Sequence, residues 1–210
     1  MKKNFTFLFA IFSVIFNVSA QNDLFLSDEI VWYGIDFSNA KFVGEFSQFD
    51  DAGTKSNKEI QRLYFPEWND LIINEPGKYN IRKFYGFEFF ANELDLVMKN
   101  NADADINVIF DPSTPNRLSK TKIQKLINSY NIKGKKGLGL VFIVDSFNKM
   151  EGQGYIYVTF FDQATKKVLS TNLYEGKPGG IGVKNYWARV ILNVMEVSGK
   201  EFKQMKKGGL

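Results

Sequence analysis

Three apolar segments near the carboxyl end of the chain dominate its pattern of hydrophobic and polar positions. Residues 138–144 (LGLVFIV) form a continuous apolar run, which is typical of a strand covered on both faces. Residues 155–161 (YIYVTFF) repeat this signal with β-branched and aromatic side chains, and residues 168–174 alternate apolar and polar after a polar turn. Because short connections join the three segments, the pattern predicts an antiparallel three-stranded meander.

A long amphipathic helix is predicted directly after this meander. A glycine-rich corner at residues 176–182 precedes it, and its two faces differ sharply in composition. One face carries Trp187, Val190, Ile191 and Val194 at helical spacing, and the opposite face carries Arg189, Asn193, Glu196 and Lys200. We therefore expect this helix to close one face of the sheet, with the Trp187 ring lying over the first two strands of the meander.

Weaker periodic segments fill the chain before the meander. Strands are expected at 30–37, in a central position, and at 106–110, while 41–46 either extends the first strand or pairs back on it. Helices are expected from a cap at Asn57 to an interruption at Pro66, from there to residue 76, at 92–100, and after a cap at Ser119. Residues 48–56 are expected to form a loop.

Alternation of strands and helices predicts a mixed α/β fold. The expected architecture is a single mixed sheet, ending in the antiparallel meander and the long closing helix, with helices on both faces. No repeat or low-complexity linker divides residues 21–210, so these are expected to form one domain.

Residues 1–20 have the three parts of a secretory signal peptide. Lys2 and Lys3 provide a positive start, residues 5–18 are mostly apolar, and Val18-Ser19-Ala20 offers small residues for cleavage. This apolar run is shorter than the ~20 residues that span a bilayer, and no later run approaches that length. The sequence therefore predicts a periplasmic or secreted protein without stable membrane insertion, beginning at Gln21.

Composition narrows the possible chemistry. The chain has no cysteine, which excludes disulfides, thiol catalysis and a lipid-anchored cysteine, and no histidine, which excludes imidazole bases and histidine-ligated metals. No metal site, cofactor or catalytic residue is identified, and any catalysis would depend on carboxylates, Lys, Tyr or a bound metal with oxygen ligands. Without Lys2 and Lys3 the net charge falls from +4 to +2, which is too small to indicate nucleic-acid binding.

The glycine-rich corner is a candidate ligand site because backbone N–H groups at a helix start favour anions. The proposed ligand-binding residues are Gly179, Gly180, Gly182, Lys184, Asn185 and Tyr186. Neither common phosphate-binding pattern is matched, since no Gly-Lys-Ser/Thr is present and the third glycine of Gly-x-Gly-x-x-Gly is missing. The alternative interpretation is a tight corner in which glycines supply positive φ angles.

A second candidate is the aromatic segment 79–90, which is ambiguous between a strand and a half-exposed groove. Phe84, Tyr85, Phe87 and Phe89 lie so close in sequence that an exposed partner surface is one interpretation. An aromatic strand buried under a helix is the other.

Several acidic residues fall at the ends of predicted strands, where sites in α/β sheets gather. Turn formation is the expected role of these aspartates, and Asp103-x-Asp105 lacks the glycine and final Glu of a calcium loop. The acids in question are Asp36, Asp50, Asp51, Asp103, Asp105, Asp111, Asp145 and Asp162.

The last third of the chain resembles exported α/β domains of bacterial envelope proteins. The resemblance rests on a strand–turn–strand with Asp162, Thr165 and Val168 in an Asp-x-x-Thr-x-x-Val pattern, followed by a long helix. Such domains occur in penicillin-binding-protein activator lipoproteins, in the curli-secretion channel lipoprotein and at the amino terminus of the Tol-system translocation protein. The start of the helix, Asn185-Tyr186-Trp187-Ala188, is also similar to a family of uncharacterised exported proteins.

This resemblance implies binding of other proteins, by analogy of fold. The lipid-attachment cysteine of the envelope lipoproteins is missing here, so membrane anchoring is not implied. The sequence therefore favours a non-enzymatic binding protein of the envelope or secretome, with a protein or glycan partner. The alternative is a carboxylate-dependent hydrolase of cell-wall glycans, which would require two acids facing each other across a cleft.

Overall fold

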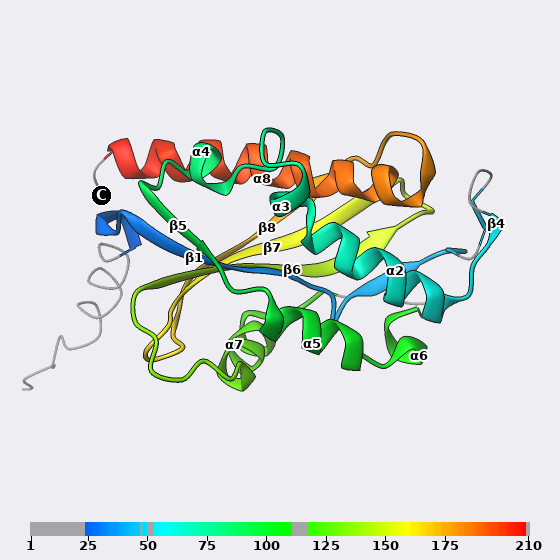
Figure 1. Cartoon of the computed structure of the whole chain (residues 1–210), viewed down its shortest axis with the longest axis horizontal. Coiled ribbons are helices and arrows are strands. Elements are labelled where there is room, and N and C mark those ends of the chain that lie inside the picture. Colours follow the sequence, from blue (N-terminus) through cyan, green and yellow to red (C-terminus); the bar gives the residue numbers. More distant parts are fainter. Residues whose placement is uncertain (1–23, 47, 50–52, 111–116, 209–210) are drawn as a thin grey trace, which may run out of the picture.

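A computed structural model describes residues 24–46, 48–49, 53–110 and 117–208 of the chain. These residues form a six-stranded mixed sheet with the order β5-β1-β6-β7-β8, in which β2 pairs with β6 beyond the end of β1 (Figure 1). The strands are β1 (Glu29–Asp36), β2 (Lys41–Val43), β5 (Phe89–Asn92), β6 (Leu138–Asn148), β7 (Gln153–Asp162) and β8 (Val168–Gly176). The predicted mixed α/β fold is confirmed. The predicted signal peptide lies outside the described residues.

The sheet combines a parallel and an antiparallel half. β1 lies between β5 and β6 and is parallel to both, which confirms its predicted central position. β6, β7 and β8 form the predicted antiparallel meander. Its second turn is held by Asp162, whose Oδ1 accepts hydrogen bonds from the N–H of Thr165 at 2.7 Å and from the Thr165 hydroxyl at 2.6 Å.

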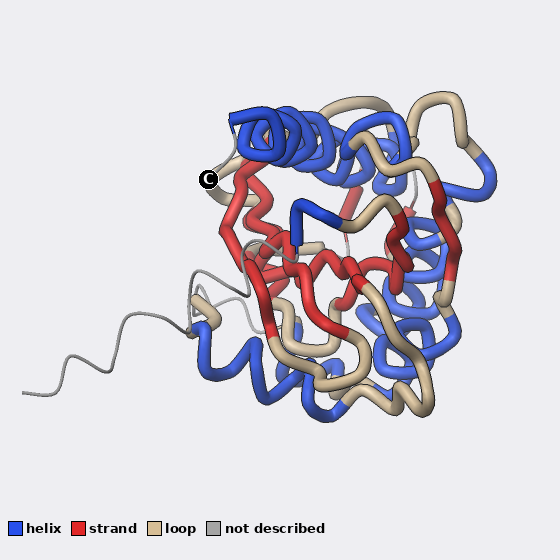
Figure 2. The backbone as a smooth tube through the Cα atoms, turned by 90° about the vertical axis from the view of Figure 1, so that its left-hand side faces the viewer, coloured by secondary structure: helices blue, strands red, loops and turns tan. Residues whose placement is uncertain are grey.

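Helices cover both faces of the sheet, as the end-on view in Figure 2 shows. One face carries α2 (Asn57–Asn69), α3 (Leu71–Asn74), α4 (Ile81–Tyr85) and α8 (Gly182–Gly208) over the larger hydrophobic core. The other face carries α5 (Asp95–Asp103) and α7 (Lys120–Ser129) over a smaller core, and α6 (Ile106–Ile109) packs near β2. None of the described helices combines the length and the apolar character needed to cross a bilayer.

The closing helix α8 has the predicted orientation. Its apolar stripe is buried and Arg189 on the opposite face is exposed. The Trp187 ring is fully buried and stacks on Phe147 of β6, with ring centroids 4.6 Å apart and an interplanar angle of 7°. A second stacked neighbour is Phe46, at 5.3 Å. Trp187 therefore lies near the carboxyl end of β6, beyond the segment that the sequence predicted it to cover.

The first long helix departs from its prediction in two ways. Its cap is Ser56 and not Asn57, because Ser56 and Glu59 form a reciprocal capping box. The predicted interruption at Pro66 was wrong, since α2 continues to Asn69. A proline inside a helix loses one hydrogen bond, but Phe65 beside it stacks on Phe37 at 4.4 Å, and this buried aromatic packing holds the helix against the sheet.

The structure also corrects or decides the predictions for four other segments. β2 pairs with β6 and therefore neither extends β1 nor pairs back on it. The predicted strand at 106–110 is instead the short helix α6, in which Ile109 is buried and Val108 is 54% exposed. Such a short apolar run does not distinguish strand from helix by periodicity. Within the predicted loop at 48–56, two-residue strands β3 (Gln48–Phe49) and β4 (Gly53–Thr54) pair antiparallel. The ambiguous segment 79–90 contains α4 and the start of β5.

Candidate functional site

Two buried aspartates lie in the sheet near the end of β1: Asp36 is the last residue of β1, and Asp145 lies within the neighbouring strand β6. Asp36 pairs in register with Ile143, and Asp145 follows two residues later on the same strand; neither aspartate has exposed surface. Asp145 occupies an irregularity at which β6 carries one residue more than β7, because Val144 pairs with Ile156 and Ser146 pairs with Tyr155. Such a bulge redirects side chains, and here it accompanies the one charged side chain of this part of β6.

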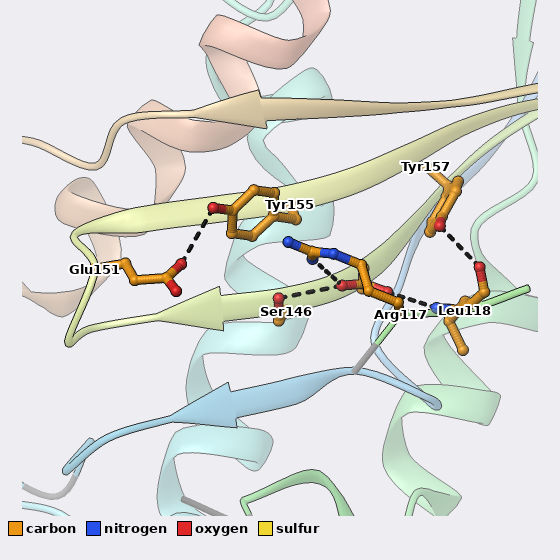
Figure 3. Close-up of polar contacts among 7 residues, drawn as sticks. Arg117, Leu118, Ser146, Glu151, Tyr155 and Tyr157 are labelled. Carbon is orange, nitrogen blue, oxygen red and sulfur yellow. Dashed lines mark hydrogen bonds and ion pairs between the residues drawn. The ribbon is translucent and has the colours of Figure 1, made fainter. Parts of the chain in front are cut away.

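Asp145 anchors the segment that leads into α7 through hydrogen bonds with Arg117 and Leu118, two residues that are labelled in Figure 3. Its Oδ2 accepts a hydrogen bond from Nη1 of Arg117 at 2.6 Å and a longer one from the Ser146 hydroxyl at 3.2 Å. Its Oδ1 accepts from the backbone N–H of Leu118 at 2.7 Å. A buried carboxylate is tolerated when it is paired and hydrogen-bonded, so Asp145 fixes the position of Arg117.

The Arg117 side chain connects this buried acid to the surface. Half of it is exposed, and its guanidinium carbon lies 4.1 Å from the centroid of the Tyr155 ring, in cation–π geometry. Burial lowers the pKa of Arg117, but the hydrogen bond and charge of Asp145 outweigh it, and the net shift is upward. Arg117 is therefore charged and held in place on two sides.

Two tyrosines of β7 continue this arrangement across the sheet. The Tyr155 hydroxyl donates to Glu151 at 3.1 Å and the Tyr157 hydroxyl donates to the Leu118 carbonyl at 2.8 Å (Figure 3). Burial and the bond to Glu151 raise the pKa of Tyr155, so its hydroxyl is protonated and able to donate at neutral pH.

Leu173 of β8 completes a small open surface beside the tyrosines. It lies directly opposite Tyr157 in the ladder and is 37% exposed, so the two side chains share one face of the sheet. We refer to Arg117, Tyr155, Tyr157 and Leu173 as the tyrosine surface. It offers aromatic rings, one aliphatic side chain and a fixed cation.

The chemistry of this surface favours contact over catalysis. Both oxygens of Asp145 are bonded within the protein and the side chain is fully buried, so it cannot reach a substrate proton. Asp145 and Glu151 balance the charge of Arg117, so the site is not a strong anion trap. Within the part of the chain that the structure describes, no three acidic side chains converge on a possible metal site.

Most of the other strand-end acids have structural contacts. Asp36 accepts hydrogen bonds from the Ser38 backbone and hydroxyl and from the Tyr130 hydroxyl, at 2.8, 2.5 and 2.6 Å. Asp105 caps α6, and Asp103 forms an exposed ion pair with Lys99. The contacts of Asp36 with Ser38 agree with the expected turn role, and none of these contacts supports a pair of hydrolytic carboxylates. Asp50, Asp51 and Asp111 lie outside the described residues.

The glycine-rich corner brings its six predicted residues together at the start of α8. Gly180 and Gly182 have φ angles of +110° and +81°, as a tight corner requires. The N–H of Gly179 donates to the Tyr186 carbonyl at 2.9 Å, and the Asn185 amide donates to the Ile181 carbonyl at 3.0 Å. These donors are used inside the corner, and the Lys184 carbonyl accepts from the Trp68 indole at 3.0 Å. The corner interpretation accounts for every one of these contacts.

The predicted aromatic surface is divided between core and solvent. Tyr85 and Phe87 are 0% and 3% exposed and belong to the larger core, so an exposed surface made of all four residues is excluded. Phe84 is half-buried against the same core, and Phe89 is 55% exposed on β5. The buried pair surrounds Phe202 of α8, at 5.7 Å and 5.3 Å, which explains why so many aromatic residues occur in this segment.

A separate apolar pocket of about 240 Å³ lies between α2 and α5. It is smaller than the ~300–1,000 Å³ typical of sites for small organic ligands. Its lining residues include Arg62, Phe65, Pro66 and Met98. We therefore assign the candidate function to the tyrosine surface.

Sequence reasoning missed the tyrosine surface, although it singled out Asp145 as a strand-end acid. Arg117, Tyr155 and Leu173 come from three separate segments, and each has an ordinary local role in its own segment. One signal was present: Tyr155 and Tyr157 place two polar tips on the same face of a strand whose other face is fully apolar.

Comparisons with known proteins do not identify a family. No protein-family model matches the chain, and no curated protein matches it. A solved structure of a hypothetical protein from Chlamydia trachomatis is similar at a TM-score of 0.34 and 9% identity, over 86% of this chain and 96% of that one.

Proposed function

We propose that this protein is an exported, non-enzymatic binding protein of the bacterial envelope or secretome, and that it captures a protein partner through the tyrosine surface. The observation that carries the proposal is the half-exposed Arg117 guanidinium, held by buried Asp145 at 2.6 Å and stacked on Tyr155. Tyr and Arg dominate the energetically important residues of protein interfaces. The predicted signal peptide supports the location, and the resemblance to envelope domains supports a protein partner by analogy.

Preorganisation is the physical reason for placing binding here. A free arginine loses much side-chain entropy when it is fixed in an interface, at a cost of ~0.5–1.5 kcal/mol for each ordered side chain. Arg117 is already fixed by Asp145 and Tyr155, and the Tyr157 hydroxyl is bonded to Leu118. A partner would therefore meet a surface whose ordering cost has been met during folding.

The experiment is capture from an envelope extract by tagged protein beginning at Gln21. We expect a protein partner to be retained by the wild type and lost with Tyr155→Ala, which removes the ring under Arg117. Ile181→Ser is the matched control, because Ile181 is 83% exposed but lies at the glycine corner. Retention of the partner by Tyr155→Ala at an unchanged melting temperature would refute the assignment. Capture of a glycan and of no protein would show that the partner is a glycan and would refute the proposed protein partner.

Export is tested separately by mass spectrometry of the native protein. We expect a start at Gln21 in the periplasmic or culture fraction. An intact Met1 terminus in the cytoplasm would remove the envelope from the proposal and leave only the binding surface.

A further inference from the structure

The edge strand β8 is long and lacks the usual protection. It spans nine residues, VLSTNLYEG, and contains neither lysine nor proline. No other strand of the described chain pairs with its outer side. An edge strand leaves a row of N–H and C=O groups available for pairing, and proteins commonly block such edges with Lys, Pro or short strands.

The opposite side of the sheet shows how this fold closes an edge. β5 has only four residues, and beyond it two buried amides bind the backbone of β1. Asn69 accepts from the Ile35 N–H at 2.7 Å and donates to the Ile35 carbonyl at 3.1 Å. Asn101 accepts from the Phe37 N–H at 2.6 Å and also donates to the Ile35 carbonyl, at 2.8 Å. Side-chain amides thus take the place of a neighbouring strand.

The same device occurs once on β8, at its beginning. Gln124 of α7 accepts from the Val168 N–H at 3.0 Å and donates to the Lys166 carbonyl at 2.8 Å. This amide supplies the donor and the acceptor that the N–H and C=O of one residue of a neighbouring strand would supply. Gln124 therefore occupies the position at which a further strand would begin to pair with β8. Among the described residues, the rest of the outer edge of β8 has no such side-chain cap.

A groove of about 650 Å³ runs along this line between β8 and α7. Residues of β8 line one side and residues of α7 line the other, as follows: Lys120, Thr121, Gln124, Lys125, Val168, Leu169, Ser170, Thr171 and Asn172. Lys120 and Lys125 are exposed, and α7 contains no acidic residue. Lys166 and Lys167 add positive charge at the adjoining turn, while Glu175, the acid of β8, is near its far end.

We propose that an extended acidic segment of a partner protein binds in this groove and adds to β8 as a further strand. Main-chain hydrogen bonds to the sheet edge would supply affinity, and the lysines of α7 would select acidic side chains. A second copy of this chain fits less well, because pairing two β8 strands edge to edge would bring two lysine-lined α7 helices together. The groove and the tyrosine surface share strand β8, which contains Leu173, but none of the groove-lining residues belongs to the tyrosine surface, and the proposal stands even if that surface binds nothing.

The test uses isotope-labelled protein and a capped decapeptide with Glu at odd positions and alternating Val and Thr at even positions. We expect amide shifts confined to residues 168–176 and α7, with a dissociation constant below about 1 mM, and slower hydrogen exchange in β8. The same peptide with Lys in place of Glu should not bind. Two further peptides carry N-methyl groups on the backbone nitrogens of either the odd or the even residues. One of them should not bind and the other should bind, because a strand pairs with its neighbour through the N–H groups of alternate residues.

Charge reversal on the protein completes the test. Lys120→Glu with Lys125→Glu should weaken binding about tenfold. The control pair Lys200→Glu with Lys207→Glu, exposed on α8, should leave it unchanged. No shift at about 1 mM peptide, equal binding of the Lys peptide, equal binding of the two methylated peptides, or a dimer through β8 in sedimentation would each overturn the proposal. Because these measurements do not involve Tyr155, their failure is separable from failure of the capture experiment.

Discussion

Replacing Trp187 by alanine should destabilise the protein strongly through loss of packing alone. The ring is fully buried between Phe147 and Phe46, and its Nε1 is without a hydrogen-bond partner among the described residues. Truncating a buried Trp typically costs ~3–5 kcal/mol, and the stacked pair with Phe147 adds ~0.5–1.5 kcal/mol. Removing a buried N–H without a partner returns ~1–3 kcal/mol, so we expect a net loss of ~3 kcal/mol.

Thermal unfolding followed by circular dichroism measures this loss. For a domain of this size, 1 kcal/mol corresponds to ~2–4 °C, so the melting temperature of Trp187→Ala should fall by ~6–12 °C. Arg189→Ala, two residues away on the exposed face, should change stability by less than ~0.5 kcal/mol.

A third variant separates the two opposing contributions. Trp187→Phe removes the N–H without a partner and keeps a ring against Phe147, so it should lose less stability than Trp187→Ala. An unshifted melting curve for Trp187→Ala would refute the reasoning, because it would mean that the ring contributes nothing to the core.

Three further predictions follow from buried contacts. Gly199→Ala should lower the melting temperature, because an added Cβ would lie 2.7 Å from the backbone oxygen of Phe84; Gly208→Ala, with open space around it, is the control, and equal curves would contradict the packing argument. Asn69→Leu should cost ~2 kcal/mol or more in chemical denaturation, since it leaves the N–H and carbonyl of Ile35 without this partner; a wild-type midpoint would contradict this. Burial, as the main cause, raises the pKa of Tyr79 to about 12, so its contribution to stability is complete below its ordinary pKa near 10 and is lost as the pH rises through 12. Denaturation midpoints measured from about pH 9 to about pH 12, roughly one unit below and two units above that ordinary value, should fall only in the upper part of the range, and a midpoint independent of pH would contradict the assignment.

The sequence by itself determined the elements in which buried positions follow a regular spacing of apolar residues. The continuous apolar run of β6 and the four-residue stripe of α8 that includes Trp187 were sufficient, because a strand or helix face that is buried along its whole length must be apolar at each turn. The turn at Asp162 was recognisable for the same reason, since its contacts to Thr165 lie within four residues. These local rules also yielded the mixed α/β class.

Tertiary structure decided what depends on neighbours distant in sequence. Pro66 stays inside α2 because its neighbour Phe65 stacks on Phe37 and on Trp68 in the core, and no local rule contains that packing. The 106–110 segment became a helix because only Ile109 finds a buried position.

The candidate sites belong to this second class. Arg117 meets Asp145 and Tyr155 only after β6 and β7 are paired and the segment before α7 is laid across them. The open edge of β8 is likewise a property of strand order, which periodicity does not encode: a strand reads the same in sequence whether its outer side faces another strand or solvent. Local sequence specifies which faces are buried, and the assembled sheet specifies which backbone groups and which side chains remain available to a partner.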